Sequence, residues 1–324
     1  MGTTPQKELQ RTGKVPSQPL VSIITVNYNQ SDLTIDFLES VRKLKWDHYE
    51  IIVVDNGSEV SPGPQIQELY PEVRYVESAE NLGFSGGNNL GIKAARGKYF
   101  LFVNNDTELT EDLLAKLVRA YEYDSKVGMV CPLIRYYHRP DVIQYAGYTE
   151  MNPMTARNST VGQFEVDTGQ YQERRYTAFA HGAAMFTSRE VIDKVGMMTE
   201  RFFLYYEELD WSARIRKAGY KIMLEPAALV FHKESMSVGK VSPLKTYYMT
   251  RNRILFMRRN APAWSLIAFL IYWLLVAMPK NLLVNMFAGR WEHVKAVWRG
   301  TCWNLCNSAT AKDDKTYVRI GALA

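Results

Sequence analysis

Short apolar runs alternate with segments of helical periodicity from Val21 to about Gly128. The runs VSIITVN, EIIVVDN and YFLFV are each bounded by turn-forming residues, which is typical of buried strands. Between the first two runs, Phe37, Leu38 and Val41 recur at helical spacing. This alternation predicts βαβ units and an α/β fold class with a mostly parallel central sheet.

Polar residues follow these runs at the points where the strands end. The stretch FLFVNNDTEL places Asn104, Asn105 and Asp106 directly after a buried strand. Thr25–Tyr28 and Asp55–Ser58 end two other predicted strands in the same way. Because ligands of open α/β sheets bind at the carboxyl ends of the strands, these segments predict a binding site.

A glycine-rich stretch, ENLGFSGGNNLGIKAARGKY, precedes the last of these strands. We expect Gly83 and Gly87 to let the backbone approach a ligand closely, ahead of a helix over about 88–95. A nucleotide diphosphate suits this edge. Asp55 can accept a hydrogen bond from a base or ribose, and Asp106 can hold a divalent cation that bridges two phosphates.

Carboxylates gather at a second place, where Glu207, Glu208 and Asp210 open a predicted helix. One interpretation is that they only complement the helix dipole. However, the preceding FFLYY is unusually aromatic for a solvated helix start. A partly dry pocket raises the pKa of a carboxylate, as a general base requires. His232, at the end of a later predicted strand, is either a metal ligand or a structural residue.

The carboxyl-terminal part differs in kind from the rest. An unbroken apolar stretch runs from Leu266 to Met278, with Pro262 and Pro279 at its edges. Spanning a bilayer takes about 20 apolar residues, so the stretch predicts a helix in the membrane interface rather than a full span. A buried core hairpin or a dimer interface is the alternative, and a homo-oligomer stays open.

Composition bounds the partners and the compartment. The net charge of +5 over 324 residues is mild, and its basic clusters favour anionic lipid or phosphate over nucleic acid; a solvated basic face is the alternative. Three cysteines are too few for a disulfide framework, which fits a reducing cytoplasm. The polar segment 1–19 has no apolar core of the kind a signal peptide needs, so we expect a lead-in and no export.

Seven blocks carry a resemblance to a known family: VSIITVNYN, IIVVDNGS, ENLGFSGGNNLGI, FLFVNNDTEL, HGAAMFTSREVIDKVG, RFFLYYEELDWSARIRKAGY and VFH. In this order they resemble glycosyltransferase family 2, in its rhamnosyltransferase-like branch, over roughly Leu20 to Asn260. The resemblance implies a GT-A fold and a donor that is a nucleotide-diphosphate sugar, with deoxythymidine or uridine as the nucleoside. It also implies a divalent metal, Mn²⁺ or Mg²⁺, and inversion at the anomeric carbon.

The resemblance also assigns roles to residues. Asp106 stands at the retained position of the metal-binding motif, and His232 aligns with a histidine that completes the metal site in some relatives. Glu208 matches the catalytic base, where the family most often has aspartate, so Glu207 and Asp210 stay open as the working base. The expected donor-site residues are Thr25, Asn27, Asp55, Gly57, Asn81, Gly83, Gly87, Asn88, Asn89, Asn104 and Asn105.

These observations predict a catalytic domain over 20–242, with a nucleotide-sugar-binding half (20–128) and an acceptor half (129–242). A helical, membrane-associated region would follow over 243–324. The predicted function is transfer of a single sugar, with rhamnose as the branch's common choice, to a lipid-linked glycan at the cytoplasmic face of the cell membrane. The alternatives are a non-catalytic nucleotide-sugar-binding or scaffold protein and a processive polysaccharide synthase. A dehydrogenase or nucleotidyltransferase is disfavoured, because no glycine follows the first strand.

Overall fold

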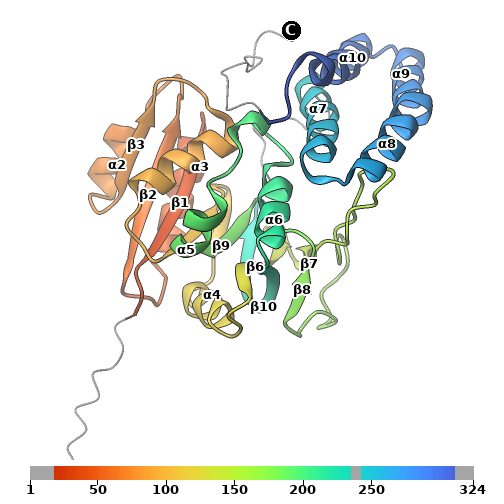
Figure 1. Ribbon diagram of the computed structural model, residues 1–324. Helices are drawn as coiled ribbons and strands as arrows, with labels where there is room; N and C mark the ends of the chain where they lie inside the picture. The colour runs from red at the N-terminus through yellow and green to blue at the C-terminus, as the bar shows by residue number, and fades with distance from the viewer. Residues whose placement is uncertain (1–17, 235–241, 311–324) are drawn as a thin grey trace, which may run out of the picture.

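The computed structural model describes residues 18–234 and 242–310, and Figure 1 shows the arrangement of its elements. Residues 1–17 of the predicted lead-in and residues 311–324 of the predicted carboxyl-terminal region lie outside the described residues. Helix α7 begins at Pro243, next to the predicted boundary at 242. The division into domains stays a prediction.

A ten-stranded mixed sheet forms the centre of the molecule, in the order β3-β2-β1-β4-β9-β6-β10-β5, with β7 on β6 and β8 on β10. Neighbours among β3, β2, β1 and β4 are parallel, as are β6 and β10, whereas β9 is antiparallel to β4 and to β6. The predicted α/β fold is confirmed, and its parallel part is the half that carries the predicted strand ends. The strands are Val21–Asn27 (β1), Tyr49–Asn56 (β2), Arg74–Ser78 (β3), Tyr99–Val103 (β4), Thr107–Leu109 (β5), Val127–Tyr136 (β6), Arg139–Tyr145 (β7), Arg175–Thr177 (β8), Ala184–Ser188 (β9) and Lys221–His232 (β10).

Helices cover both faces of the sheet, which explains why the central strands are apolar throughout. Ile23 and Leu101 pack with α1, α2 and α4 on one face, and their neighbours Ile24 and Phe102 pack with α3, α5 and α6 on the other. The helices are Ser31–Val41 (α1), Gly63–Leu69 (α2), Gly83–Ala94 (α3), Leu113–Tyr121 (α4), Arg189–Val195 (α5), Glu207–Lys217 (α6), Pro243–Asn260 (α7), Ala263–Tyr272 (α8), Met278–Phe287 (α9) and Trp291–Cys306 (α10). Two short helical turns, Glu200–Phe202 (η1) and the π-helical Trp273–Ala277 (η2), complete the described elements.

Helix α3 starts at Gly83, so the predicted start near Asn88 is wrong. Asn81 Oδ1 accepts a hydrogen bond from Gly83 N at 2.8 Å, and Phe84 N donates to Phe203 O at 2.7 Å. These bonds satisfy amides of the first turn, which otherwise lack partners. The glycine-rich stretch is therefore helix rather than loop. Gly87 serves close packing on the sheet, since a Cβ there would lie 2.8 Å from Val26 Cγ1.

The four carboxyl-terminal helices form a separate layer beside α6, seen at the upper right of Figure 1. Helix α10 lies so close to α7 that a Cβ on Gly300 would come within 2.9 Å of Tyr247 O. Helices α8 and α9 join through η2 into one helix, Ala263–Phe287, of 25 residues. Proline normally clashes with the carbonyl four residues earlier, but Pro279 follows the wider π turn, where the helix tolerates it.

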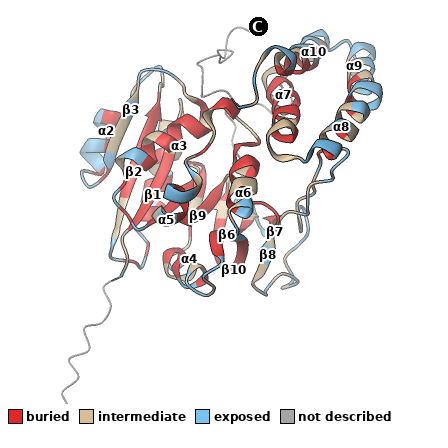
Figure 2. Cartoon of the chain, viewed as in Figure 1, coloured by how far each residue is buried: buried red, intermediate tan, exposed pale blue. Residues whose placement is uncertain are grey.

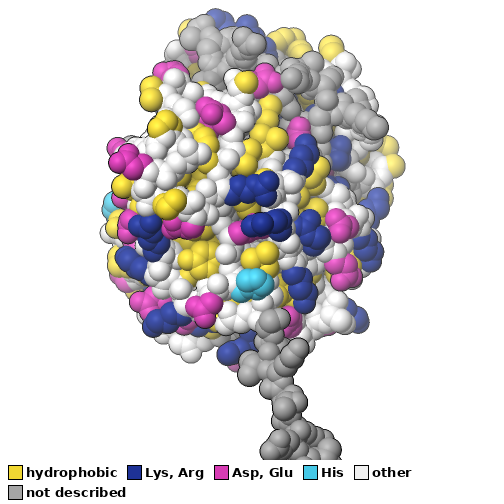
Figure 3. Space-filling model, turned by 90° about the vertical axis from the view of Figure 1, so that its left-hand side faces the viewer, with side chains coloured by type: hydrophobic (Ala, Val, Ile, Leu, Met, Phe, Trp, Pro, Cys, Tyr) yellow, Lys and Arg dark blue, Asp and Glu magenta, His cyan; other side chains and the backbone are white. Residues whose placement is uncertain are grey.

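This long helix overturns one step of the sequence analysis, which ended the apolar segment at Pro279. It is long and apolar enough to cross a membrane, and 17% of its most apolar window is buried. Its large exposed side chains include Leu275 and Phe287, which are 74% and 89% exposed. Figure 2 shows stretches of exposed residues, in pale blue, along α9. On the opposite side of the molecule, around α2 and β3, charged side chains of both signs are interspersed with apolar ones (Figure 3).

Replacing Gly83 with alanine tests the close approach of α3 to the loop before α6. Gly83 has φ 71°, and a Cβ there would lie 2.2 Å from Phe203 O. Gly219→Ala is the matched control, because Gly219 has φ 94° but nothing within 4 Å of its added Cβ. We expect Gly83→Ala to lower the free energy of unfolding by about 1–3 kcal/mol more than Gly219→Ala, measured by denaturant titration. Equal losses would contradict the packing described here.

Candidate active site

Asp55, at the end of β2, is fixed by hydrogen bonds on its protein side. Its Oδ1 accepts from Asn27 Nδ2 at 2.7 Å and from Ser58 Oγ at 2.5 Å, and its Oδ2 accepts from Ser58 N at 3.2 Å. Gly57 has φ 79°, and a Cβ there would lie 2.6 Å from the carbonyl carbon of Glu80. The turn after β2 therefore admits only glycine, and it holds Asp55 rigidly at the sheet edge.

Asn27 connects this cluster to the end of β4. Its Oδ1 accepts a hydrogen bond from Thr34 Oγ1 at 2.9 Å, and Thr34 Oγ1 in turn accepts from Asn105 Nδ2 at 2.9 Å. Asn104 is tied by its backbone N to Ala183 O at 3.1 Å, and its side chain stays partly exposed. The ends of β1, β2 and β4 therefore meet, as the sequence analysis expected.

Asp106 and His232 form a buried pair beside these strand ends. Pairing of β5 with β10 brings them together, and Asp106 Oδ1 lies 3.2 Å from His232 Nε2. Gln144 Oε1 lies 2.8 Å from His232 Nδ1, so Nδ1 donates, and in the neutral form of the ring the Nε2 lone pair faces Asp106. Within the described residues, the two carboxylate oxygens of Asp106 and the Nε2 atom of His232 have no hydrogen-bond partner.

Three buried acceptor atoms without a donor are what a divalent cation satisfies, so this pair fits Mn²⁺ or Mg²⁺. The residues that the structure describes bring no third histidine, cysteine, aspartate or glutamate into the group. Substrate phosphates and water would have to supply the remaining ligands, as is common for magnesium-type sites.

Two side chains that the sequence analysis missed lie next to this pair. The ring centre of His181 is 6.3 Å from that of His232, and Tyr148 stacks on His181 at 6.0 Å. Burial lowers the pKa of His181 to about 3, and the nearby His232 adds to the shift, so His181 is neutral. Burial and, secondarily, the charge of Glu208 raise the pKa of Tyr148. Tyr148 and His181 thus lie between the Asp106–His232 pair and Glu208.

Glu207 and Glu208 begin α6 in different surroundings. Burial, and then the charge of Glu208, raise the pKa of Glu207 well above its ordinary value, and Glu207 Oε2 has no hydrogen-bond partner in the described part of the chain. Desolvation raises the pKa of Glu208 to about 7, while its side chain stays partly exposed. Glu208 is therefore the carboxylate that can exchange a proton with a substrate near neutral pH.

The loop before these glutamates is strained and tightly held. Phe203, Tyr205 and Tyr206 all have positive φ, at 64°, 68° and 74°. Buried Arg251 on α7 donates through Nη2 to Arg201 O at 2.6 Å and to Phe202 O at 2.7 Å. Its neighbour Asn252 donates through Nδ2 to the carbonyls of Phe202, Leu204 and Tyr205 at 2.7 to 2.9 Å. We call these two side chains the loop clamp.

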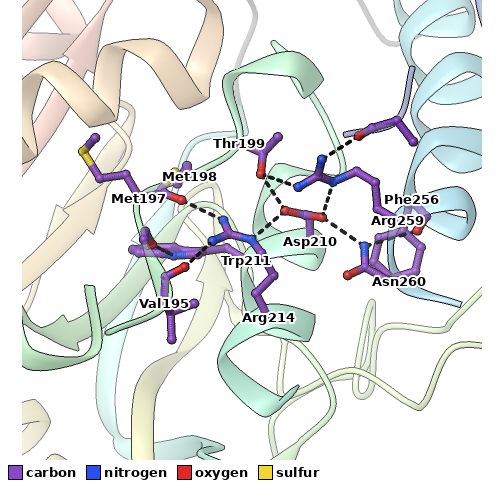
Figure 4. Close-up of polar contacts among 12 residues, drawn as sticks. Val195, Met197, Met198, Thr199, Asp210, Trp211, Arg214, Phe256, Arg259 and Asn260 are labelled. Carbon is purple, nitrogen blue, oxygen red and sulfur yellow. Dashed lines mark hydrogen bonds and ion pairs between the residues drawn. The ribbon is translucent and has the colours of Figure 1, made fainter. Parts of the chain in front are cut away.

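Asp210, the third candidate base, is engaged in structural contacts (Figure 4). It is fully buried, and its Oδ2 accepts from Thr199 Oγ1 at 2.8 Å and from Arg214 Nε at 2.9 Å. Its Oδ1 accepts from Arg259 Nε and Asn260 Nδ2, both at 3.0 Å. The two guanidinium groups offset the effect of burial and leave the pKa of Asp210 below its ordinary value. This geometry leaves neither oxygen free to take a substrate proton.

Other predicted donor-site residues also contact protein rather than an open edge. Asn89 Nδ2 donates to Met198 O and to Glu200 Oε1, both at 2.9 Å, and Asn88 Nδ2 donates to Phe84 O. Thr25 is fully buried within β1. Asn81 caps α3, as described above. These residues contact other parts of the protein, and their assignment to the donor site, with that of Gly83 and Gly87, stays a prediction.

The mixed α/β sheet, with buried carboxylates at the ends of its parallel strands, has the architecture of a GT-A nucleotide-sugar transferase. The chain belongs to glycosyl transferase family 2, whose model matches residues 22–196, more than half of its length. The resemblance seen in the sequence is thereby confirmed, and the chain is a glycosyltransferase.

Curated relatives differ in their reactions. An N-acetylglucosaminyl-diphospho-decaprenol L-rhamnosyltransferase of Mycobacterium tuberculosis is 23% identical over 241 residues, covering 68% of this chain and 78% of the relative. A poly-beta-1,6-N-acetyl-D-glucosamine synthase of Staphylococcus aureus is 25% identical over 215 residues, covering 64% of this chain and 48% of the relative. The chain therefore matches about half of the synthase.

A solved structure supports the fold. The mannosyltransferase PcManGT from Pyrobaculum calidifontis, in complex with GDP-Man and Mn²⁺, superposes with a TM-score of 0.56 at 16% identity. The match covers 89% of this chain and 87% of that chain. The expected GT-A fold is therefore confirmed.

Asp210→Asn tests the structural role of this carboxylate. The change leaves the Arg214 and Arg259 guanidinium groups without their shared anion, and breaking a buried ion pair costs about 3–5 kcal/mol. We expect a loss of this size in the free energy of unfolding, measured by denaturant titration. Asp112→Asn is the control, since Asp112 is exposed and pairs with Lys116 at the surface. An unchanged stability in Asp210→Asn would show that this ion-pair cluster contributes nothing.

Proposed function

We propose that this chain is a metal-dependent, inverting glycosyltransferase that transfers one sugar from a nucleotide-diphosphate donor to a hydroxyl group of a lipid-linked glycan. The observation that carries this proposal is the buried Asp106–His232 pair, whose three acceptor atoms lack donors and lie beside the Asp55 cluster. A family-2 glycosyltransferase needs a diphosphate site, and this edge has the ligand types for one.

On this proposal, Asp55 and Asn27 contact the nucleoside, and Asn104 and Asn105 line the approach to the diphosphate. Asp106 and His232 would hold the divalent ion, which, when bound, would supply positive charge to stabilise the leaving diphosphate. Gln144 positions His232 by fixing its tautomer. Uridine and deoxythymidine diphosphates are the proposed carriers, and rhamnose is the first sugar to test.

Glu208 is the proposed general base. It removes the proton from the acceptor hydroxyl as that oxygen bonds to the anomeric carbon, and the bond to the nucleoside diphosphate breaks on the opposite face. Glu207 lies next to this residue in the chain, and burial together with the charge of Glu208 raises the pKa of Glu207 well above its ordinary value. Asp210 acts as a positioning residue that fixes α6 through its ion pairs.

The proposed acceptor is lipid-linked because the helix Ala263–Phe287 exposes an apolar surface. We place the chain at the cytoplasmic face of the cell membrane. The helix Ala263–Phe287, within the carboxyl-terminal region, would contact the lipid. The mycobacterial relative named for a decaprenol-linked substrate supports this choice. Single transfer is favoured over processive synthesis because the described residues contain one helix long enough to cross a membrane.

Nucleotide binding tests the donor site. Isothermal titration with uridine, deoxythymidine and guanosine diphosphates, with and without Mn²⁺, should show pyrimidine binding that needs the metal. Asp106→Asn should weaken Mn²⁺-dependent binding by at least about 10- to 100-fold, since the loss of even an outer-shell partner of a ligand costs this much metal affinity. Asp112→Asn should bind as the unaltered chain does. If nucleotide binding depended on neither the metal nor Asp106, or if no nucleotide bound, the results would contradict this donor site and favour the non-catalytic scaffold alternative.

The pH dependence of donor turnover tests the base. A carboxylate with a pKa of about 7 accepts a proton only when deprotonated, so kcat/KM should fall about tenfold for each pH unit below 7 and level off above it. Glu208→Gln should lose about 10²- to 10⁴-fold in rate and keep nucleotide binding. Glu68→Gln, a change at an exposed carboxylate on α2, should match the unaltered chain. Full activity in Glu208→Gln would exclude this residue as the base.

A further inference from the structure

A cavity of about 300 Å³ lies among the carboxyl-terminal helices, apart from the predicted donor edge. Its walls come from α7, η2, α9 and α10 and from the loop that carries Arg157. We call it the basic pocket. Its lining residues are Arg157, Ser242, Lys245, Thr246, Met249, Thr250, Arg253, Trp273, Asn281, Asn285 and Val297.

The charge of the basic pocket is one-sided. Three of its lining residues, Arg157, Lys245 and Arg253, are cations, and none is an aspartate or glutamate. Across residues 18–234 and 242–310, no carboxylate lies within ion-pair distance of any of these three cations. Lys245 and Arg253 are also half-buried, and partly desolvated cations without a counter-ion are unfavourable. The pocket is therefore complementary to an anion.

The pocket wall also holds an unused donor. Trp273 is 1% exposed, and its Nε1 has no hydrogen-bond partner among the described residues. Buried indole N–H groups normally find an acceptor. An anion with several oxygens would satisfy both this kind of donor and the guanidinium groups, which bind phosphate oxygens in pairs.

The basic pocket borders the loop that positions the proposed base. Arg253 Nε donates to Tyr206 Oη at 3.2 Å, and Lys245 Nζ lies 5.7 Å from the ring centre of Tyr205. Tyr205 and Tyr206 directly precede Glu207 in the chain. Only Tyr205 and Tyr206 therefore separate these cations of the pocket from the start of α6 along the chain.

The same pocket borders the apolar surface. Trp273, Asn281 and Asn285 belong to the long helix Ala263–Phe287, which also carries large exposed apolar side chains such as Leu275. An amphiphile with an anionic head and an apolar tail would match this arrangement, with its head in the pocket and its tail along the helix. A soluble anion would use the cations but not the apolar surface.

We propose that the basic pocket binds the diphosphate group of a polyprenyl diphosphate that carries the acceptor sugar. This inference rests on the proposed function, because it takes the acceptor to be lipid-linked. Arg157, Lys245 and Arg253 neutralise the diphosphate, and the sugar beyond it extends toward Glu208. These cations therefore bind the acceptor through a group that takes no part in the reaction.

Vesicle binding by the full chain tests this proposal. The probes are phosphatidylcholine vesicles doped with a long-chain polyprenyl diphosphate and vesicles of equal charge doped with phosphatidylglycerol. The unaltered chain should prefer the diphosphate vesicles. Lys245→Gln and Arg157→Gln, in two separate segments, should each weaken diphosphate binding by about tenfold, the typical effect of one charged hydrogen bond. Lys280→Gln removes the same charge from an exposed position on α9 and should leave the preference intact.

Three outcomes would overturn the proposal. Equal binding to both vesicles, or equal losses in Lys280→Gln, would show only attraction to a charged surface. Inorganic pyrophosphate that binds in solution as tightly as the vesicles would identify a site for a free phosphate. If Lys245→Gln and Arg157→Gln both kept the preference for diphosphate vesicles, with melting temperatures unchanged, the basic pocket would be excluded as the binding site. Nucleotide titration of the same samples separates these failures from failure of the proposed function, because donor binding does not need the pocket.

Discussion

Five hydrogen bonds from two neighbouring side chains of α7 hold the loop from which the rest of the site is built. Positive φ at three non-glycine residues costs about 1–3 kcal/mol each, so this loop persists only where its surroundings over-determine it. Arg251 and Asn252 supply that constraint from the carboxyl-terminal side, and Phe84 N adds a bond from α3. The glutamates that follow therefore owe their position to parts of the chain far apart in sequence.

Helix α6 shows how surroundings separate three carboxylates within four residues. Asp210 meets two guanidinium groups, which leave its pKa below the ordinary value, whereas burial and the charge of Glu208 raise the pKa of Glu207 well above it. Glu208 lies between these extremes and keeps partial exposure. The same kind of acid thus has a lowered, a strongly raised or a moderately raised pKa, according to its neighbours.

Much of the fold follows from local sequence, because buried strands and turn residues leave a pattern that needs no knowledge of distant contacts. The strand ends around Asp55 and Asn105 were predictable in this way, and the acidic segment was too. The start of α3 was not, because Gly83 is held by Phe203, far along the chain. Tyr148 and His181 were missed for the same reason, since only the folded sheet brings them to His232. The length of the apolar helix was misjudged because a π turn, which has no sequence signature of its own, accommodates Pro279.

The close approach of α10 to α7 at Gly300 bears on how such a chain can diversify. Trp303 of α10 stacks over the Arg251 guanidinium at 4.7 Å, and Asn304 Nδ2 donates to Arg251 O at 2.9 Å. Arg251 therefore contacts two neighbours, the loop before α6 on one side and α10 on the other. The carboxyl-terminal helices cannot be exchanged between relatives as an independent cassette. A new set of helices preserves the site only if it brings its own match for α7, so change in the carboxyl-terminal helices is coupled to the loop that precedes Glu207.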